Sequence, residues 1–286
     1  MQQPTTIRPM LCHRYKTHKQ HIPYPCYVQP KLNGIRAIFD SDHNRWQSHS
    51  RVTKEVRFWG PNILAHITSQ LEGLFSTRVI LDGELYRHGW PLQRINGAVS
   101  VNRRDTSHDT GEVNYHVFDI VADAPFTDRY DALQQLSTVY PYVVTTRFVS
   151  SPSAAEHFYA LWKREGYEGM VYRNPVAHYG FLERCGNKEN RWNYIIKRKD
   201  HATAEFTIVG VEEEFDKYAR PKGRVGSLVL ECDNGNTFRA GSGLSDDQRQ
   251  RYWDKSPVGL VATIAFEMYS QSGVPLQPRV EEVHDA

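Results

Sequence analysis

One lysine, placed between two short apolar runs and beside an Asn-Gly pair, constrains the fold of this chain more than any other residue. Tyr27-Val28 leads up to Lys31, and the run Ile35 to Phe39 follows it after Asn33-Gly34. Apolar runs separated by Asn-Gly predict two strands joined by a tight hairpin turn, with Lys31 at the end of the first strand. Pro30 fixes the backbone just ahead of that lysine.

Lys31 has two interpretations. Most lysines are solvated surface charges, and the rim of a hairpin is a common place for one. A lysine amine becomes a nucleophile only when it has lost its proton, which requires burial or neighbouring cations that lower its pKa. Arg36 follows the predicted turn and is therefore expected close to Lys31. Short motifs recur by chance, so the choice depends on the rest of the chain.

Composition bounds the class of protein. The chain has 286 residues, with 35 Lys plus Arg against 33 Asp plus Glu, so a net charge of +2 excludes a large polycation but not a local basic face. No apolar run reaches membrane-spanning length, and residues 1–8 lack the apolar core of a secretory signal. Four widely spaced cysteines without a C-x-x-C motif predict neither a disulfide framework nor a zinc site, and favour a cytoplasmic protein.

The first two hundred residues alternate short strands and helices, after an irregular leader over residues 1–25. An Asp82-Gly83 turn is expected between two strands, a Ser153/Glu156 capping box begins a helix, and Gly166 ends it. Apolar periodicity predicts strands at 46–50, 79–81, 84–86, 113–121, 143–149, 169–173 and 195–199, and helices at 61–74 and 127–136 and around 158–162.

The pattern of expected elements changes after His201. Strands are expected at 206–211, 227–231, 237–240 and 261–269, with an Asn234-Gly235 hairpin turn and a helix at 246–252. This content predicts a small five-stranded β-barrel of the OB type. We therefore expect an α+β protein with a first domain of antiparallel sheets and helices at 1–200 and an OB-fold barrel at 201–286.

A set of polar and aromatic residues falls at predicted strand ends in the first domain. Each one alone is compatible with an ordinary solvated residue. Together they supply a nucleophile, cations for phosphate oxygens, carboxylates for a divalent metal and an aromatic platform for a base. The set is Lys31, Arg36, Arg51, Glu84, Phe118 with Asp119, Glu168, Lys197 and Lys199.

These residues lie in motifs that resemble those of the ATP-dependent DNA ligases of the minimal two-domain type, which are covalent nucleotidyltransferases. The first family motif is K-x-D-G-x-R, and Lys31-Leu32-Asn33-Gly34-Ile35-Arg36 matches it except that Asn33 replaces Asp. The other matching stretches are Ser50 to Lys54, Leu81 to Glu84, Tyr115 to Asp119, Glu168 to Val171 and Ile195 to Lys199, and in the second domain Gly226 to Leu230, Phe238 to Gly243 and Asp246 to Arg249.

The resemblance implies an adenylation domain followed by an OB domain, which together seal nicks in double-stranded DNA with ATP and Mg²⁺, as a monomer. Lys31 is implied as the nucleophile that carries AMP, and Phe118 as the ring that stacks on adenine. The implied phosphate ligands are Arg36, Arg51, Lys197 and Lys199, and the implied metal ligands are Glu84, which also contacts ribose, and Glu168. An RNA ligase or an mRNA-capping nucleotidyltransferase remains the alternative.

Two departures from the family pattern stand out. The last family motif carries R-x-P, whereas Gly273-Val274 precedes Pro275 here, and Arg279 is the candidate replacement for a later basic residue. Some minimal viral members carry a long insertion that latches around DNA, but the corresponding segment, residues 212–226, is short. DNA contact is expected mainly at phosphates, through the basic window of residues 184–199 and part of the OB face.

Overall fold

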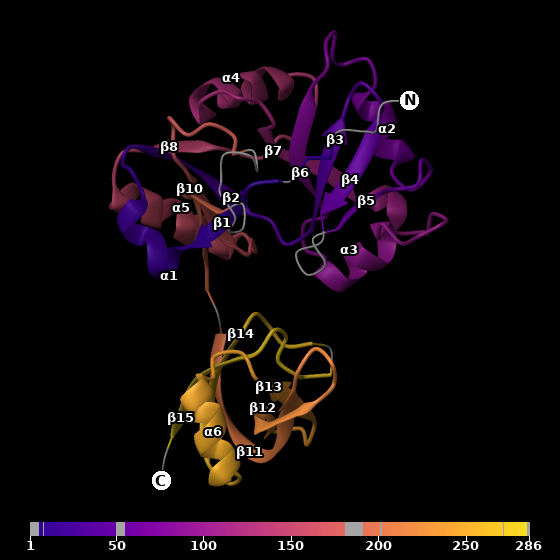
Figure 1. The fold of residues 1–286 in the computed structure, drawn as a ribbon. Helices are drawn as coiled ribbons and strands as arrows, with labels where there is room; N and C mark the ends of the chain where they lie inside the picture. Colours follow the sequence, from indigo (N-terminus) through magenta and orange to yellow (C-terminus); the bar gives the residue numbers. More distant parts are fainter. Residues whose placement is uncertain are drawn as a thin grey trace. The chain divides into compact units, whose positions relative to one another are not determined.

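Three five-stranded sheets organise the chain in the computed structural model (Figure 1). The structure describes residues 6–7, 9–49, 55–180, 191–200, 202–270 and 272–284. Two compact units are present, Met1–Lys199 with two of the sheets and Asp200–Ala286 with the third. No helix in the described part of the chain is long and apolar enough to cross a membrane.

The first sheet, sheet A, holds the strand that ends in Lys31. Its order is β1-β10-β9-β2-β8, in which β1 runs parallel to β10 and the other neighbours are antiparallel. A core that includes Val28, Met170 and Ile196 lies on its outer face under two helices, α1 and α5. The elements are β1 (Leu11–Arg14), β2 (Cys26–Lys31), β8 (Arg147–Val149), β9 (Gly169–Arg173), β10 (Arg191–Lys199), α1 (Tyr15–His18), η1 (Lys19–His21) and α5 (Pro152–Arg164).

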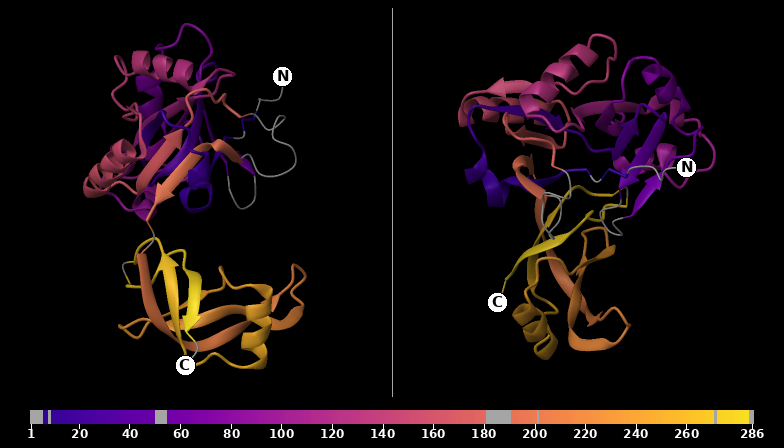
Figure 2. Two further views of the ribbon diagram at one scale, coloured as in Figure 1. Left: turned by 90° about the vertical axis from the view of Figure 1, so that its left-hand side faces the viewer. Right: turned by 45° about the horizontal axis from the view of Figure 1, so that its top comes forward.

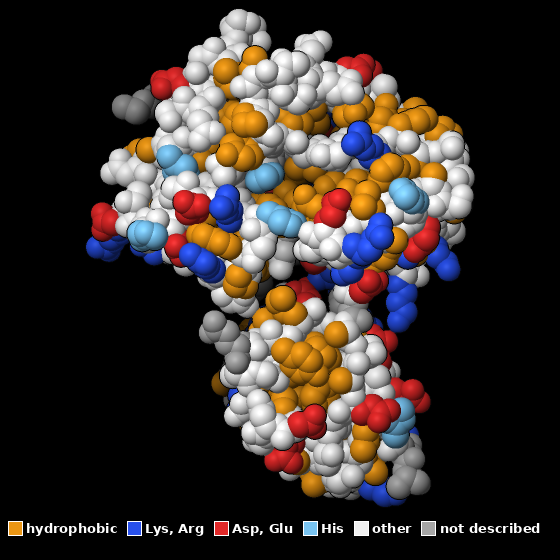
Figure 3. All heavy atoms as spheres, turned by 180° about the vertical axis from the view of Figure 1, so that it is seen from behind, with side chains coloured by type: hydrophobic (Ala, Val, Ile, Leu, Met, Phe, Trp, Pro, Cys, Tyr) orange, Lys and Arg blue, Asp and Glu red, His pale blue; other side chains and the backbone are white. Residues whose placement is uncertain are grey.

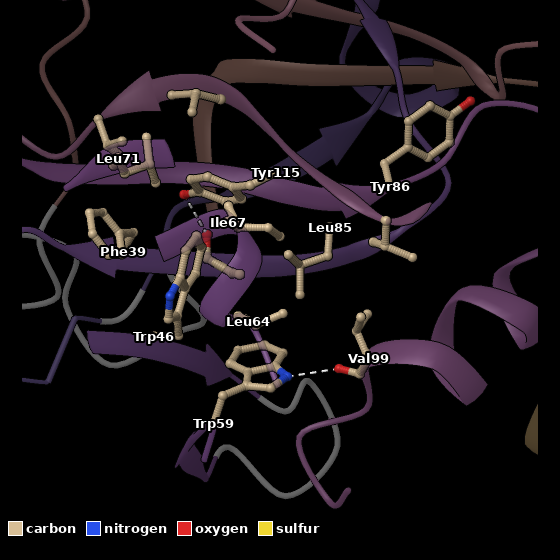
Figure 4. Packing of buried hydrophobic residues seen from close by; sticks show 14 of the residues in the cluster. Phe39, Trp46, Trp59, Leu64, Ile67, Leu71, Leu85, Tyr86, Val99 and Tyr115 are labelled. Carbon is tan, nitrogen blue, oxygen red and sulfur yellow. Dashed lines mark hydrogen bonds between the residues drawn. The ribbon is translucent and has the colours of Figure 1, made fainter. Parts of the chain in front are cut away.

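The second sheet, sheet B, has the order β5-β4-β3-β6-β7. Its largest core packs around Phe39, Leu81 and Tyr115, and Figure 4 shows Trp59 in this core donating its indole N–H to Val99 O (2.7 Å). The elements are β3 (Ile35–Asp40), β4 (Arg45–His49), β5 (Val56–Phe58), β6 (Ile80–Tyr86), β7 (Asn114–Ile120), α2 (Ala65–Leu71), α3 (Leu92–Val99), η2 (Thr110–Glu112) and α4 (Phe126–Leu136).

A small apolar core joins the inner faces of the two sheets. It includes Ile38 from β3 and Ile195 from β10, together with Met10, Val121 and Tyr179. Residues that alternate with the outer cores therefore point into the space between sheets A and B. This space is where the described polar residues singled out in the sequence lie.

The second unit is one antiparallel sheet with a single described helix, visible from other sides in Figure 2. The sheet order is β13-β12-β11-β14-β15, and the N–H of Val280 donates to Ser242 O (2.8 Å), so the two edges approach each other. Hydrophobic side chains gather on the face of this unit seen in Figure 3. The elements are β11 (Ala202–Phe215), β12 (Pro221–Glu231), β13 (Thr237–Ala240), α6 (Asp246–Asp254), β14 (Val261–Phe266) and β15 (Arg279–His284).

The hairpin predicted around Lys31 is wrong. Strands β2 and β3 do not pair with each other, because β2 belongs to sheet A and β3 to sheet B. The Asn33-Gly34 link crosses between the sheets instead. A Cβ on Gly34 would lie 2.3 Å from Leu85 O, so the glycine is required by close backbone approach and not by a hairpin turn.

The Asp82-Gly83 turn is also wrong, since both residues lie inside the continuous strand β6. The pairing of β6 with β7 is irregular at this point: Asp82 pairs with Asp119 and Gly83 with Val117, which leaves Phe118 as an extra, bulged residue. Bulges of this kind re-aim side chains beside functional sites.

Three smaller expectations need correction. The N-terminal leader is not wholly irregular, because β1 and α1 form within it. The cap of α5 is Ser151, whose hydroxyl accepts the N–H of Ala154, and not Ser153. Strand β15 lacked a recognised sequence signal, whereas the turn at Gly235 and the helix beginning after Ser245 are confirmed.

Replacing Gly83 by alanine should lower the free energy of unfolding by about 1–3 kcal/mol. The added Cβ would lie 2.6 Å from both His116 O and the Tyr115 ring, and the backbone oxygen has no rotamer by which to withdraw. Gly97→Ala is the matched control: it lies inside α3 with no atom near the new Cβ, so it should stabilise by roughly 0.5–1 kcal/mol. Urea titration of both variants measures this, and equal effects would contradict the packing argument.

Candidate active site

Lys31 shares one carboxylate with a second lysine. Lys31 is the last residue of β2, pairs with Gly169 of β9, and accepts the N–H of Glu168 through its backbone carbonyl (3.1 Å). The Glu168 carboxylate forms an ion pair with Lys31 Nζ and a second with Lys199 Nζ (3.0 Å). All three side chains are mostly buried, with 14–17% of each exposed.

The charge balance at Glu168 favours its ionised form. Burial raises the pKa of this carboxyl, but the two adjacent lysine ammonium groups outweigh burial and lower the pKa below its ordinary value. Glu168 is therefore an anion at neutral pH, held between two cations. Two lysines facing one carboxylate leave an excess of positive charge in this part of the site.

Strand β10 divides its basic residues between two faces. Lys197 pairs with Val171 and Lys199 with Gly169, so both lysines lie on the inner face beside Lys31. Arg198 points the other way, where it forms an ion pair with Glu156 (2.5 Å) and lies over the Tyr159 ring (3.7 Å). The alternation seen in the sequence therefore separates two site lysines from one structural arginine.

Glu84 comes to the site from sheet B. It lies opposite Arg36 of β3 on one side and His116 of β7 on the other. Its Oε1 accepts the N–H of Gly34 (3.0 Å), which connects this strand directly to the link that follows Lys31. Glu84 and Glu168 thus come from different sheets, on either side of the Lys31 segment.

The Arg36 side chain is paired with Asp82 of the neighbouring strand β6, and it does not face Lys31 across a turn. Its guanidinium donates to both oxygens of Asp82 (2.9 and 2.5 Å) and to Met10 O (2.5 Å). Burial lowers the pKa of Arg36, but the Asp82 carboxylate raises the pKa by a larger amount, so the net shift is upward. The hydroxyl of Tyr179 donates to the same carboxylate (2.7 Å). The phosphate contact implied for Arg36 remains a prediction.

Phe118 lies at the bulge of β7 between two guanidinium groups. The Cζ atom of Arg36 is 5.4 Å from the ring centroid, and that of Arg173 is 5.3 Å away. Both distances are those of cation–π contacts. The ring is partly buried against the core of sheet B, so Phe118 is held in a fixed position.

Asp119 anchors a buried network that the sequence did not reveal, although its position was noted beside Phe118. Its carboxylate binds Arg129 (2.7 Å) and Arg173 (2.6 Å), and all three side chains are at most 5% exposed. Arg173 also donates to Gln29 Oε1 (3.0 Å), whose Nε2 donates to Phe118 O (3.0 Å). The network joins β7 of sheet B to β2 and β9 of sheet A.

Part of the predicted site lies outside the described residues. This applies to Arg51, within residues 50–54, and to the basic positions of the window over residues 181–190. Among the described residues, the structure brings Lys31, Glu168, Lys197 and Lys199 together on sheet A. It places Arg36, Glu84 and Phe118 on sheet B, with Arg36 close to Phe118.

No group of three or more His, Cys, Asp and Glu residues suited to a metal ion occurs in the described part of the chain. Magnesium in nucleotide sites is usually held by one or two carboxylates together with substrate phosphates, so it needs no larger protein cage. Glu168 and Glu84, flanking the Lys31 segment, fit that pattern.

Comparison with known families identifies the family of the chain. The family model described as the ATP-dependent DNA ligase domain matches residues 9–192. The chain belongs to this family. A second model, described as a DNA ligase OB-like domain, matches residues 218–283 of the second unit.

Curated relatives of this chain include proteins named DNA ligase. The chain is 27% identical over 275 residues to the DNA ligase of a warthog isolate of African swine fever virus, covering 88% of this chain. The match spans 62% of the viral protein's length, so the chain corresponds to only part of that relative.

Solved structures support the fold. A structure from a study of DNA binding with a minimal scaffold in Lig E DNA ligases has a TM-score of 0.77 at 23% identity, and covers 98% of this chain and 100% of its own. The Chlorella virus DNA ligase-adenylate has a TM-score of 0.51 at 21% identity and covers 99% of each chain. An α+β ligase fold with an OB-like second unit is thus confirmed.

Replacing Asp119 by asparagine should lower the free energy of unfolding by about 3–5 kcal/mol, because two buried arginines would lose their counter-charge. Asp123→Asn is the control, since its ion pair with His178 is about half exposed on both sides and should contribute under ~1 kcal/mol. Chemical denaturation compares the two, and similar effects would refute a special role for Asp119.

His116 should make stability depend on pH. Burial and the neighbouring His88 lower its pKa to about 4, against an ordinary value of 6.5. Below pH 6.5 the unfolded chain therefore takes up a proton that the folded protein refuses, and stability falls as the pH drops towards 4.

Between pH 7 and pH 5 this effect amounts to about 2 kcal/mol. His116→Gln should remove that part of the pH dependence, measured as the difference in unfolding free energy between wild type and variant at each pH. His108→Gln is the control, because its side chain is fully exposed. A His116 variant with the wild-type pH slope would argue against a neutral, buried imidazole.

Proposed function

We propose that this protein is an ATP-dependent DNA ligase that seals nicks carrying a 5′-phosphate and a 3′-hydroxyl in duplex DNA. The observation that carries the proposal is the shared ion pair of Lys31 and Lys199 with Glu168, in a site with a third lysine on the same face. A lysine nucleophile for phosphate chemistry needs neighbouring cations that bind the phosphate, and a carboxylate that can hold a divalent metal, and this arrangement supplies both. The family membership and the names of the relatives support the same activity.

The proposed reaction has three steps. Lys31 Nζ loses a proton and attacks the α-phosphorus of ATP, forming a P–N bond as the bond to pyrophosphate breaks. The AMP group then moves to the 5′-phosphate of the nick, which frees Lys31 and gives a DNA-adenylate. The 3′-hydroxyl attacks that 5′-phosphorus, so the phosphodiester forms and AMP leaves. A covalent intermediate replaces one difficult step with easier ones.

The side chains have separate roles in this proposal. Lys197 and Lys199 bind the α-phosphate, and their charge favours the neutral amine of Lys31. Phe118 stacks on adenine, and Arg36 and Arg51 contact phosphates. Magnesium, bound by Glu84 and Glu168, would neutralise charge on the phosphate oxygens.

Nicked double-stranded DNA is the proposed partner, contacted mainly at its phosphates so that any sequence is accepted. Action as a monomer in the cytoplasm is part of the same proposal. The alternative, an RNA ligase or capping-type nucleotidyltransferase, shares Lys31 and differs in the substrate that accepts the nucleotide.

The test is self-labelling with α-labelled ATP and magnesium, followed by a chase with nicked duplex DNA. Wild type should take up label on Lys31 and lose it as the strand is sealed. Lys31→Ala should take up none, because the substitution removes the attacking amine. Lys16→Ala, which alters an exposed lysine of α1, serves as the matched control and should label normally.

Label that RNA ends discharge and nicked DNA does not would replace the DNA ligase proposal with the RNA ligase alternative. Uptake from GTP in preference to ATP would favour a capping enzyme. If wild type takes up no label even after treatment with pyrophosphate, which removes AMP already bound, the proposal fails.

A further inference from the structure

Arg14 lies at the edge of sheet A beside a site lysine. Strand β1 runs along β10 (Figure 1), and Arg14 is the register partner of Lys197. Side chains of directly paired residues point to the same face of a sheet. The register therefore places Arg14 on the inner face, next to Lys197.

The neighbours of Arg14 give the same orientation independently. The ring of His13 stacks on His18 of α1, with centroids 3.8 Å apart, and the ring of Tyr15 stacks on Tyr172 at 5.7 Å. Both contacts lie on the outer face, since Tyr172 belongs to the outer core of sheet A and α1 is one of the two helices that cover this core. Arg14 has extended backbone between them and so points to the opposite, inner face.

No acidic side chain among the described residues neutralises the charge of Arg14. Its side chain is exposed. Neighbouring strands are ~4.8 Å apart and alternate residues of one strand ~6.7 Å apart, so Arg14 Cα lies roughly 8 Å from that of Lys199. A row of cations at this spacing suits a ligand with several phosphate groups, and a guanidinium binds phosphate in two-pronged fashion.

We propose that Arg14 is a further phosphate-binding residue of this site, one strand beyond Lys197. Its ligand is a substrate phosphate that the inner lysines do not reach. This is either the β- or γ-phosphate of the nucleotide or a backbone phosphate of the nicked strand. The proposal rests on the proposed function for the identity of these substrates, and on geometry alone for phosphate binding.

The two phosphate sources separate in two kinetic measurements. Arg14→Ala and Arg14→Lys are compared with Lys19→Ala, which removes an exposed cation from the same segment but from η1, outside the sheet. Formation of the Lys31 adenylate is followed against ATP concentration without DNA. Discharge of preformed adenylate is then followed on nicked DNA.

If Arg14 contacts the nucleotide, Arg14→Ala should need a roughly ten-fold higher ATP concentration for half-maximal adenylate formation, with discharge unchanged. A charge-assisted hydrogen bond is worth about that factor in affinity. A DNA contact predicts the reverse, a discharge roughly ten-fold slower at subsaturating DNA. In either case Arg14→Lys should recover part of the loss and Lys19→Ala should match wild type. If Arg14 were only structural, its replacement would affect both adenylate formation and discharge, and lysine would not restore one of them selectively.

A third measurement needs no enzymatic activity. Inorganic pyrophosphate, added without magnesium, should raise the melting temperature of wild type and Lys19→Ala more than that of Arg14→Ala. If wild type forms no adenylate, the ligase proposal fails while this binding test still stands. Arg14→Ala that matches Lys19→Ala in ATP dependence, in discharge and in the pyrophosphate shift would overturn the assignment.

Discussion

The first unit depends on one buried carboxylate, that of Asp119. Two arginines almost without exposed surface converge on it, one from α4 and one from β9. Removing three charged groups from water is unfavourable unless each finds a partner, and here each does. Arg173 extends the network to Gln29, two residues before Lys31 on β2. The position of the nucleophile's strand relative to sheet B is thus fixed through hydrogen bonds that leave no buried donor or acceptor unsatisfied among the described side chains.

The parts of the site that could be predicted from the sequence are those set by local pattern. Local patterns predicted that Lys31 and Lys199 each end a strand and that a strand follows Glu168, and the structure has these three strands. Which strands lie side by side is a non-local property that no such pattern contains. The parallel pairing of β1 with β10 joins segments about 180 residues apart, and it was not expected.

Local turn chemistry misled at two glycines for a shared physical reason. Asn-Gly and Asp-Gly are frequent in hairpin turns because glycine tolerates positive φ. Neither Gly34 nor Gly83 adopts positive φ here, and each instead lies where another backbone atom comes within 2.6 Å of the missing Cβ. Glycine has two uses that look identical in a sequence, and close approach of a neighbouring strand of sheet B selects the second. At Gly235, on a sheet edge, the first use prevails and φ is +79°.

The ion pairs of the site also constrain how it can exchange partners. In the proposed reaction, phosphate oxygens replace Glu168 as the partner of Lys199, and Lys31 must separate from Glu168 before its amine attacks the α-phosphorus. A carboxylate that gives up two ammonium groups is left anionic in a mostly buried position, which is unfavourable without a new cation. Binding of the phosphates and binding of a divalent cation should therefore be mutually dependent at Glu168, each supplying the charge that the other requires.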